Sequence, residues 1–235
     1  MKNIFLLFLS VMLFTACGEL QQIMEQFPET GIDNQEIAAG LKEALEKGID
    51  RQVSSLMTEG GFYNQPDVRI LLPAELQNVD KTLRQVGLGS LADEGIKLLN
   101  RAAEEAVKEA KPVFIKAIRE MTFEDARKIL MGADTAATAY LQQKTRDELY
   151  NKFYPVVQNS FRKVGADRLW NEIFSRYNQI PFVEPVETDL TAYVTRQALQ
   201  GVYKKIAVEE KRIRTDIRAR TTDLLKKIFA LQDNR

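Results

Sequence analysis

Residues 33–56 read DNQEIAAGLKEALEKGIDRQVSSL and carry the clearest structural signal of the chain. Asp33 and Glu36 stand at the spacing of a capping box, in which each side chain accepts a hydrogen bond from the other residue's backbone N–H at the start of a helix. Apolar residues then recur every three or four positions, at Ile37, Leu41, Leu45, Ile49, Val53 and Leu56. Because this period matches one face of an α-helix, the stretch predicts a long amphipathic helix that ends before Gly60 and Gly61.

The same helical period continues along the rest of the chain. Pro73 and Thr122 stand where helices begin, whereas Gly87, Gly132 and Gly165 stand where they end. We expect further helices over about residues 73–86, 90–110, 112–121, 122–131, 134–161, 166–178, 188–215 and 222–230, with a bend near Pro155 and with Pro112 either kinking the preceding helix or starting a new one. Residues 68–72 look extended but are too few for a sheet. The sequence therefore predicts an all-α fold, a single helical-bundle-like domain of about eight helices.

The N-terminus has the three parts of an export signal. A positive charge at Lys2 precedes the apolar run 4–14, and the small pair Thr15 and Ala16 leads to Cys17, the only cysteine in the sequence. The run is too short to span a bilayer, which takes about 20 apolar residues. Ordinary secretory cleavage needs a small residue where Phe14 stands, so cleavage directly before Cys17 by the lipoprotein route fits better. The stretch resembles the bacterial lipobox, with Phe14 where leucine is most common.

The domain organisation follows from this leader. We predict a signal peptide over residues 1–16, a tether over residues 17–33 that begins at lipidated Cys17, and a helical domain over residues 34–235. The tether has Pro28 and Gly31 as breakers and shows no sustained period. Because the diacylglycerol that the lipobox implies supplies two acyl chains, Cys17 would bind the membrane stably. The expected location is the bacterial cell envelope, with the anchor in the outer membrane and the domain facing the periplasm; surface display is the alternative.

The charges of the chain balance at 33 Lys and Arg against 33 Asp and Glu. This balance gives no reason to expect nucleic acid as a partner. One basic stretch near the C-terminus could bind anionic lipid headgroups, although Asp216 and Asp223 dilute its charge. It consists of Lys211, Arg212, Arg214, Arg218 and Arg220.

The chain lacks the residues from which many active sites are built. It contains no histidine, which excludes Ser-His-Asp and Cys-His machinery and the histidine-containing di-metal bundles, and zinc would lack its usual ligands. No GxxxxGK phosphate loop occurs. Residues 87–92, GLGSLA, match part of the dinucleotide fingerprint, but they follow a predicted helix instead of a strand, so we interpret them as a turn. We predict no catalytic residue, no metal site and no cofactor.

The connection between the first two helices, residues 58–72, is unusually long. It carries Phe62 and Tyr63 among aliphatic residues. Long loops inside compact domains are often functional or locally packed. One interpretation is a lid or partner-binding loop with aromatic anchors, and the other, which we favour, is a segment that buries these side chains against the helices.

Short strings spread from about Gly40 to Phe229 add a family resemblance. They include GLKEAL at 40–45, GF at 61–62, ILLP at 70–73, NRAAE at 100–104, MT at 121–122, EDA at 124–126, AAT at 136–138, KT at 144–145, IPF at 180–182, DL at 189–190, EE at 209–210 and IR at 213–214. Together they resemble a family of exported bacterial proteins catalogued as domain of unknown function 4197. The resemblance implies an all-helical fold and brings no assigned activity, ligand or catalytic residue.

The polar members of these strings give a shortlist of ligand-binding or polar-network residues. Helix caps and buried networks that fix helix packing explain them at least as well as a ligand does. The shortlist is Asn100, Arg101, Glu104, Asp125, Lys144, Thr145, Asp189, Glu210 and Arg214.

Three functions from different classes remain open. The main hypothesis is a non-enzymatic domain that binds a protein or another component of the cell envelope. The second is a carrier that holds an apolar or lipid ligand between its helices. The third is a carboxylate-based hydrolase, which would need at least two of its shortlisted carboxylates to converge in a cleft with raised pKa values. These carboxylates are Glu104, Asp125, Asp189 and Glu210.

Overall fold

The computed structural model describes residues 33–183 and 189–233. The predicted signal peptide, Cys17, the tether up to residue 32 and the expected helix start at Thr188 lie outside the described residues. Within the described ranges the chain forms helices and no strand, which confirms the all-α fold. The elements are α3 (Asn34–Leu56), α4 (Ala74–Gln85), α5 (Gly89–Val107), α6 (Ala110–Arg119), α7 (Phe123–Leu130), α8 (Ala136–Val164), α9 (Ala166–Asn178), α10 (Leu190–Thr215), the 3₁₀-helix η1 (Ile217–Ala219) and α11 (Asp223–Asp233).

Local capping explains where several helices begin. The Asp33 carboxylate accepts the Glu36 N–H at 2.7 Å, and Glu36 accepts the Asp33 N–H in return, so the expected capping box opens α3. Thr122 and Asp125 form the same motif at α7. Each box satisfies backbone N–H groups that have no partner inside the helix. The starts of α3 and α7 rest on neighbouring side chains and were therefore predictable.

Pro112, Pro155 and Gly165 lie at or near helix boundaries or within a helix in the middle of the chain. The helical run breaks at Lys108 and Glu109, and α6 then begins at Ala110, so Pro112 lies in the first turn of α6, where its missing N–H costs nothing. Helix α8 continues through Pro155 and ends at Gly165. Gly165 has a φ of +72°, which glycine adopts without strain, and it passes the chain directly into α9.

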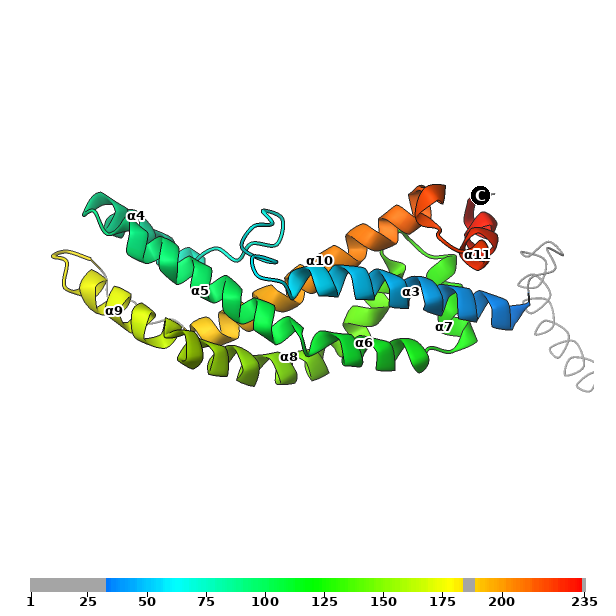
Figure 1. Ribbon diagram of the computed structural model, residues 1–235, viewed down its shortest axis with the longest axis horizontal. Helices are drawn as coiled ribbons and strands as arrows, with labels where there is room; N and C mark the ends of the chain where they lie inside the picture. Colours follow the sequence, from blue (N-terminus) through cyan, green and yellow to red (C-terminus); the bar gives the residue numbers. More distant parts are fainter. Residues whose placement is uncertain (1–32, 184–188, 234–235) are drawn as a thin grey trace, which may run out of the picture.

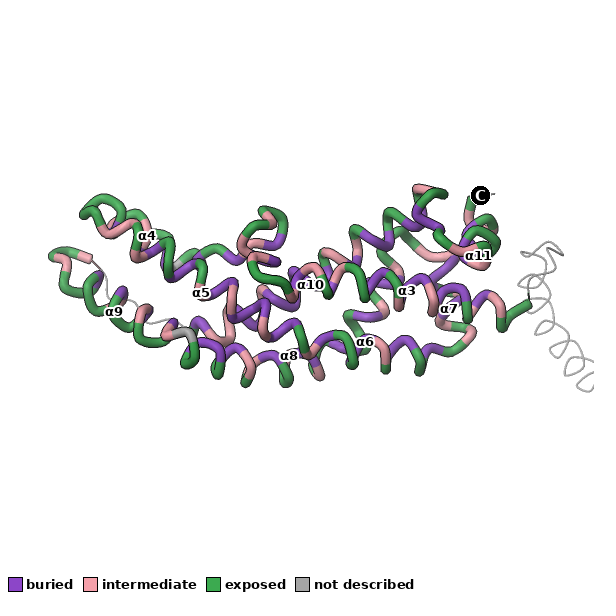
Figure 2. Tube along the Cα trace, in the orientation of Figure 1, coloured by how far each residue is buried: buried purple, intermediate pink, exposed green. Residues whose placement is uncertain are grey.

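The helices form an elongated body (Figure 1). Helices α3, α7 and α11 lie at the end next to the described N-terminus, α4 and α9 lie at the opposite end, and α5, α8 and α10 connect the two. Buried residues follow the facing sides of the helices along the whole length (Figure 2). Phe62, Phe114 and Phe153 are fully buried and are the largest such side chains of this core.

The α4–α9 end depends on a close approach between α5 and α9. Gly95 of α5 lies against Trp170 of α9, and a Cβ atom on Gly95 would come within 2.9 Å of the indole ring. Trp170 is 3% exposed, and its indole N–H has no hydrogen-bond partner among the described residues. Glycine is needed at position 95 because any larger residue would push the two helices apart.

The long connection of residues 58–72 is packed against the helices. Phe62, Val68 and Ile70 are buried, and Phe62 lies so close to Gly201 of α10 that a Cβ there would be 2.7 Å from its ring. Tyr63 is partly exposed, with the Arg69 guanidinium 3.9 Å from its ring centroid. The packed interpretation is confirmed for Phe62, Val68, Ile70 and Leu72, whereas Leu71 is 59% exposed.

Two buried residues of α10 join three helices. The Glu210 carboxylate accepts the backbone N–H groups of Ala137 at 2.9 Å and Thr138 at 2.8 Å, so it caps the start of α8. One turn later, the Arg214 guanidinium donates to the backbone carbonyls of Ile129 at 2.7 Å and Leu130 at 3.1 Å, which end α7. The two side chains also bind each other at 2.9 Å. We call this arrangement the α10 clamp.

The clamp corrects one expected boundary. The sequence placed the start of the long helix at Asp134, but α8 begins at Ala136, and its N-cap residue Thr135 makes no side-chain hydrogen bond. Glu210 supplies the missing acceptor from 72 residues along the chain. A negative carboxylate at a helix N-terminus and a cation at a C-terminus also each match the helix dipole.

We expect Arg214→Ala to lower the free energy of unfolding by about 3–5 kcal/mol, because it leaves a buried carboxylate without its cation and two buried carbonyls without a donor. The matched control is Arg218→Ala, whose side chain is 90% exposed and should change stability by less than about 0.5 kcal/mol. Urea denaturation followed by circular dichroism measures both. Equal losses in the two variants would contradict the clamp.

Candidate functional site

Two shortlisted residues of α5, Asn100 and Glu104, hold the 58–72 segment in place, and a third, Arg101, pairs with Glu104. The Asn100 amide accepts the Ile70 N–H and donates to the Ile70 carbonyl, each at 2.8 Å, as a paired strand would. The Glu104 carboxylate accepts the Phe62 N–H at 3.2 Å and pairs with Arg101 at 3.3 Å. Asn100 and Glu104 are buried, and both are used by the fold.

The shortlisted carboxylates do not converge. Asp125 caps α7, Asp189 accepts the Ala192 N–H at 3.0 Å to cap α10, Glu210 belongs to the α10 clamp and Glu104 binds the 58–72 segment. The hydrogen bonds that Thr122 donates hold the pKa of Asp125 below its usual value, which is the wrong direction for a general acid. No pair of these four carboxylates forms the acid–base site that a hydrolase would need.

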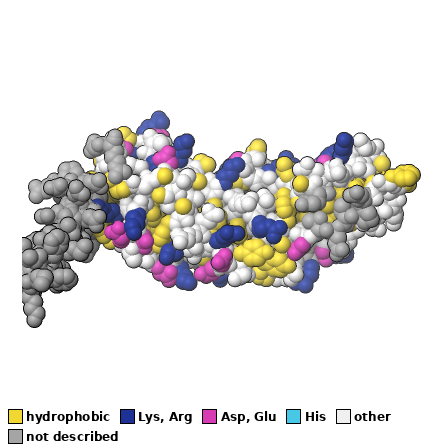
Figure 3. Space-filling view, turned by 180° about the vertical axis from the view of Figure 1, so that it is seen from behind, with side chains coloured by type: hydrophobic (Ala, Val, Ile, Leu, Met, Phe, Trp, Pro, Cys, Tyr) yellow, Lys and Arg dark blue, Asp and Glu magenta, His cyan; other side chains and the backbone are white. Residues whose placement is uncertain are grey.

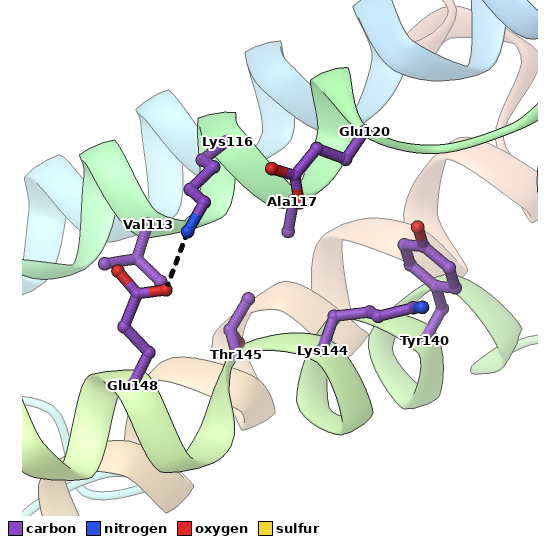
Figure 4. A pocket seen from close by; sticks show the side chains of 8 residues that line it. All are labelled: Val113, Lys116, Ala117, Glu120, Tyr140, Lys144, Thr145 and Glu148. Atoms are coloured by element: carbon purple, nitrogen blue, oxygen red, sulfur yellow. Dashed lines mark hydrogen bonds and ion pairs between the residues drawn. The ribbon is translucent and has the colours of Figure 1, made fainter.

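Lys144 and Thr145, the remaining shortlisted residues, line a cleft between α6 and α8 (Figure 4). The cleft has a volume of about 90 Å³ and is partly enclosed. Its walls combine two lysines, two glutamates, a tyrosine and a threonine with two small apolar residues. The lining residues are Val113, Lys116, Ala117 and Glu120 from α6, and Tyr140, Lys144, Thr145 and Glu148 from α8.

The charges of the cleft alternate in sign along both helices. Lys116 and Glu120 are one turn apart on α6, and Lys144 and Glu148 are one turn apart on α8. Lys116 bridges the cleft to Glu148 at 3.3 Å (Figure 4). Lys144 has no ion pair with any residue that the structure describes, and its Nζ lies 5.7 Å from the Tyr140 ring centroid. One cation of the cleft is therefore available to a ligand.

Two tyrosines in or next to the cleft are less acidic than usual. Burial raises the pKa of Tyr140, and the nearby carboxylates of Asp125 and Glu120 raise it further. Burial also raises the pKa of Tyr203, whose hydroxyl lies 2.8 Å from the Thr145 hydroxyl behind the cleft. The Thr145 hydroxyl donates its hydrogen to the Leu141 carbonyl at 2.6 Å, so the Tyr203 hydroxyl is the donor toward Thr145. Tyr140 thus presents a neutral hydroxyl to the cleft over the physiological pH range.

Sequence reasoning found only two of the eight residues of this cleft. It missed Tyr140, Glu120, Lys116 and Glu148 because nothing in one helix shows which helix it faces. A signal was present in the spacing, since Tyr140, Lys144 and Glu148 follow one another at four-residue intervals on a single helix face. This four-residue spacing places the three side chains in one row on α8, and the row faces α6.

The basic stretch of α10 does not form a single surface. Arg214 and Arg220 are buried, the latter bound to the carbonyls of Ile213 and Arg214, and Arg212 pairs with Glu209 at 2.6 Å. Lys211, Arg212 and Arg218 remain exposed, and two of them, Arg212 and Arg218, are paired with acids. Figure 3 shows one face of the molecule, on which basic and acidic side chains are interspersed. The headgroup-binding interpretation of residues 211–220 thus loses two of its five cations to helix capping.

Two further properties of the described part bear on the site. No three of its acidic or cysteine side chains come close enough together to hold a metal ion. None of its helices is both long enough and apolar enough to cross a membrane.

The described part of the chain is all-helical and carries a small, charged cleft on its surface. A family model with the description "Protein of unknown function (DUF4197)" matches residues 31–230. The chain belongs to this family, as its sequence strings indicated. No curated protein and no solved structure matches the chain.

The raised pKa of Tyr140 makes stability fall at high pH. The unfolded state loses the phenolic proton near pH 10, whereas the folded state retains it to higher pH, so the unfolded state binds fewer protons and the free energy of unfolding declines as pH rises past about 10. In Tyr140→Phe this contribution is absent. We expect a smaller stability loss between about pH 9 and pH 11 in the variant, as measured by urea denaturation, with Tyr203 contributing the remainder. Identical stability losses in the native protein and in Tyr140→Phe would contradict a raised pKa at Tyr140.

Proposed function

We propose that the protein is a lipid-anchored helical domain of the bacterial cell envelope that binds an envelope component without chemical turnover. In this proposal Cys17 carries the lipid, the outer membrane holds the anchor and the domain faces the periplasm. The support for the anchor is the leader itself: the apolar run 4–14, the small residues Thr15 and Ala16, and the single cysteine that follows them.

The cleft between α6 and α8 is the observation that carries the binding role. The lining has two lysines and two glutamates. A group that bears a single sign of charge would be repelled by two of these four side chains, so the cleft favours a partner that presents both signs. The adjacent acidic and basic side chains of a protein loop have this character. A volume of about 90 Å³ suits such side chains and is too small for a lipid.

The two other hypotheses find less support. A hydrolase would need a convergent carboxylate pair. The four shortlisted carboxylates lie at separate places: two cap helices, one belongs to the α10 clamp and one binds the 58–72 segment. A carrier would need space between the helices, but the apolar faces of α5, α8 and α10 meet in a core that buries Phe114 and Phe153 completely. An envelope protein is therefore the partner that we propose for the cleft.

Photo-crosslinking in cells tests the binding role. With a photoreactive amino acid in place of Tyr140, we expect one reproducible adduct with an envelope protein, because position 140 lines the cleft. The matched control carries the same amino acid in place of Tyr154, a partly exposed tyrosine of the same helix outside the cleft. The adduct should appear at position 140 only, and Lys144→Glu should reduce it severalfold.

Two outcomes would count against the proposal. Equal adducts at positions 140 and 154 would show that the cleft does not select the partner. Turnover by the purified protein that Glu104→Ala or Lys144→Ala abolishes, with the fold retained, would replace binding by catalysis.

Cell fractionation tests the anchor separately. The native protein should sediment with membranes, and Cys17→Ser should move it to the soluble periplasmic fraction, because the thiol that accepts the lipid is gone. As a control, Phe14→Leu restores the most common lipobox residue and should keep the protein in the membrane fraction. Membrane association that survives Cys17→Ser would reject the anchor without affecting the cleft.

A further inference from the structure

A second depression lies on the other side of α6, against the end of α3. Its volume is about 690 Å³, within the usual range of ligand sites, and it is open to solvent. Met57, Pro112 and Ile115 form an apolar floor. Lys108 and Lys111 stand at one end of this floor, and Lys116 and Arg119 stand at the other. We call it the α6 groove.

The cations of the groove are available to an incoming acid. Lys108 pairs with Glu105, Lys111 with Asp50 and Lys116 with Glu148, but these lysines are about half exposed. Exposed pairs of this kind contribute roughly 0–1 kcal/mol and exchange partners readily. Arg119 has no ion pair with any residue in the described ranges, although its carbonyl accepts the Lys42 ammonium at 3.0 Å. Glu120 is the one acid in the lining.

An apolar floor with cations at both ends calls for an occupant with an apolar face and acids at both ends. A fatty acid has a single anionic end and would leave one pair of cations unmatched. An acidic amphipathic segment matches both ends, as helices in grooves do. The groove therefore favours a peptide over a single-chain lipid.

The chain itself contains such a segment, immediately before the helical domain. The tether as a whole has no sustained period, but Leu20, Ile23, Met24 and Phe27, just before Pro28, have the spacing of one helix face over two turns. Glu19, Glu25 and Glu29 accompany them, and no lysine or arginine occurs between Gly18 and Asp33. We propose that residues 19–29 dock in the α6 groove, with their apolar side chains on its floor and their glutamates toward its cations.

The length of the connection allows this docking. Helices α3 and α6 run antiparallel, since Lys42 contacts Arg119 and Asp50 pairs with Lys111. Ile115 is thus level with about residue 46, which lies ~18 Å along α3 from Asn34 at 1.5 Å per residue. Five helical steps from Met24 to Glu29 and four extended steps from Glu29 to Asp33 together span up to ~21 Å. Met24 can therefore reach Ile115.

Docking would change what the tether does. Residues 19–29 would pack against α6 instead of serving only as a spacer between Cys17 and the helical domain. Their release would expose the groove and lengthen the connection to Cys17. The inference does not depend on the lipid or on the α6–α8 cleft, and its test avoids Lys116 and Glu120, which line both sites.

Disulfide trapping in the full chain tests the docking, with Cys17→Ser in every variant so that the introduced cysteines are the only thiols. A disulfide needs Cα atoms within about 7 Å, so the pair Met24→Cys and Ile115→Cys should crosslink in oxidising conditions and shift the protein on a non-reducing gel. The control pair is Met24→Cys and Lys128→Cys, because Lys128 is exposed on α7, beside α3 but away from the groove. The yield of the first pair should exceed that of the control severalfold.

Charge reversal tests the pairing of acids with cations. Arg119→Glu should lower the Met24–Ile115 crosslink severalfold, and adding Glu25→Lys should restore much of it. Equal yields for the two cysteine pairs, or no effect of Arg119→Glu, would overturn the proposal. Dimers formed by Ile115→Cys alone would also overturn it, because a second copy would then occupy the groove.

Discussion

The α10 clamp is the interaction on which the arrangement of the body depends. Glu210 and Arg214 stand one turn apart on α10. The carboxylate binds the start of α8, and the guanidinium binds the end of α7. The five residues that connect α7 to α8 are thereby fixed at both of their ends. Because α8 also forms one wall of the cleft, the clamp sets the position of Tyr140 and Lys144 from the far side of the core.

Helix α6 has the opposite character. It is short, it follows a break in the helical run, and both of its flanks border open depressions that share Lys116 and Glu120. A ligand that attracts Lys116 into the groove would compete with Glu148 for this lysine and so alter the cleft. The inner face of α6 is nevertheless packed into the core, where Ala110, Val113, Phe114, Ala117 and Ile118 are buried, so only its outer side chains line the two depressions.

The sequence predicted what is encoded locally. Asp33 with Glu36 and Thr122 with Asp125 lie within one helical turn of each other, and the apolar period of α3 needs no knowledge of its neighbours. By contrast, Glu210 caps α8 by accepting the Ala137 N–H, 73 residues earlier in the chain, and neither its spacing nor its type distinguishes it from an exposed glutamate. The cleft shows the same limit. Lys144 and Thr145 came from family strings, whereas Lys116 and Glu120 join them only because α6 packs on α8, which no single helix period reveals.

Trp170 gives the molecule a built-in optical probe. It is the only tryptophan of the sequence, and it is buried against Gly95 between α5 and α9. Its fluorescence should therefore be blue-shifted in the native state and move to longer wavelength when α9 separates from α5. Helix α9 contacts α4, α5 and α8 and lies at the opposite end of the body from α3 (Figure 1). The emission will consequently report loss of that end of the fold, while ligands bound beside α6 must be followed with a label of their own.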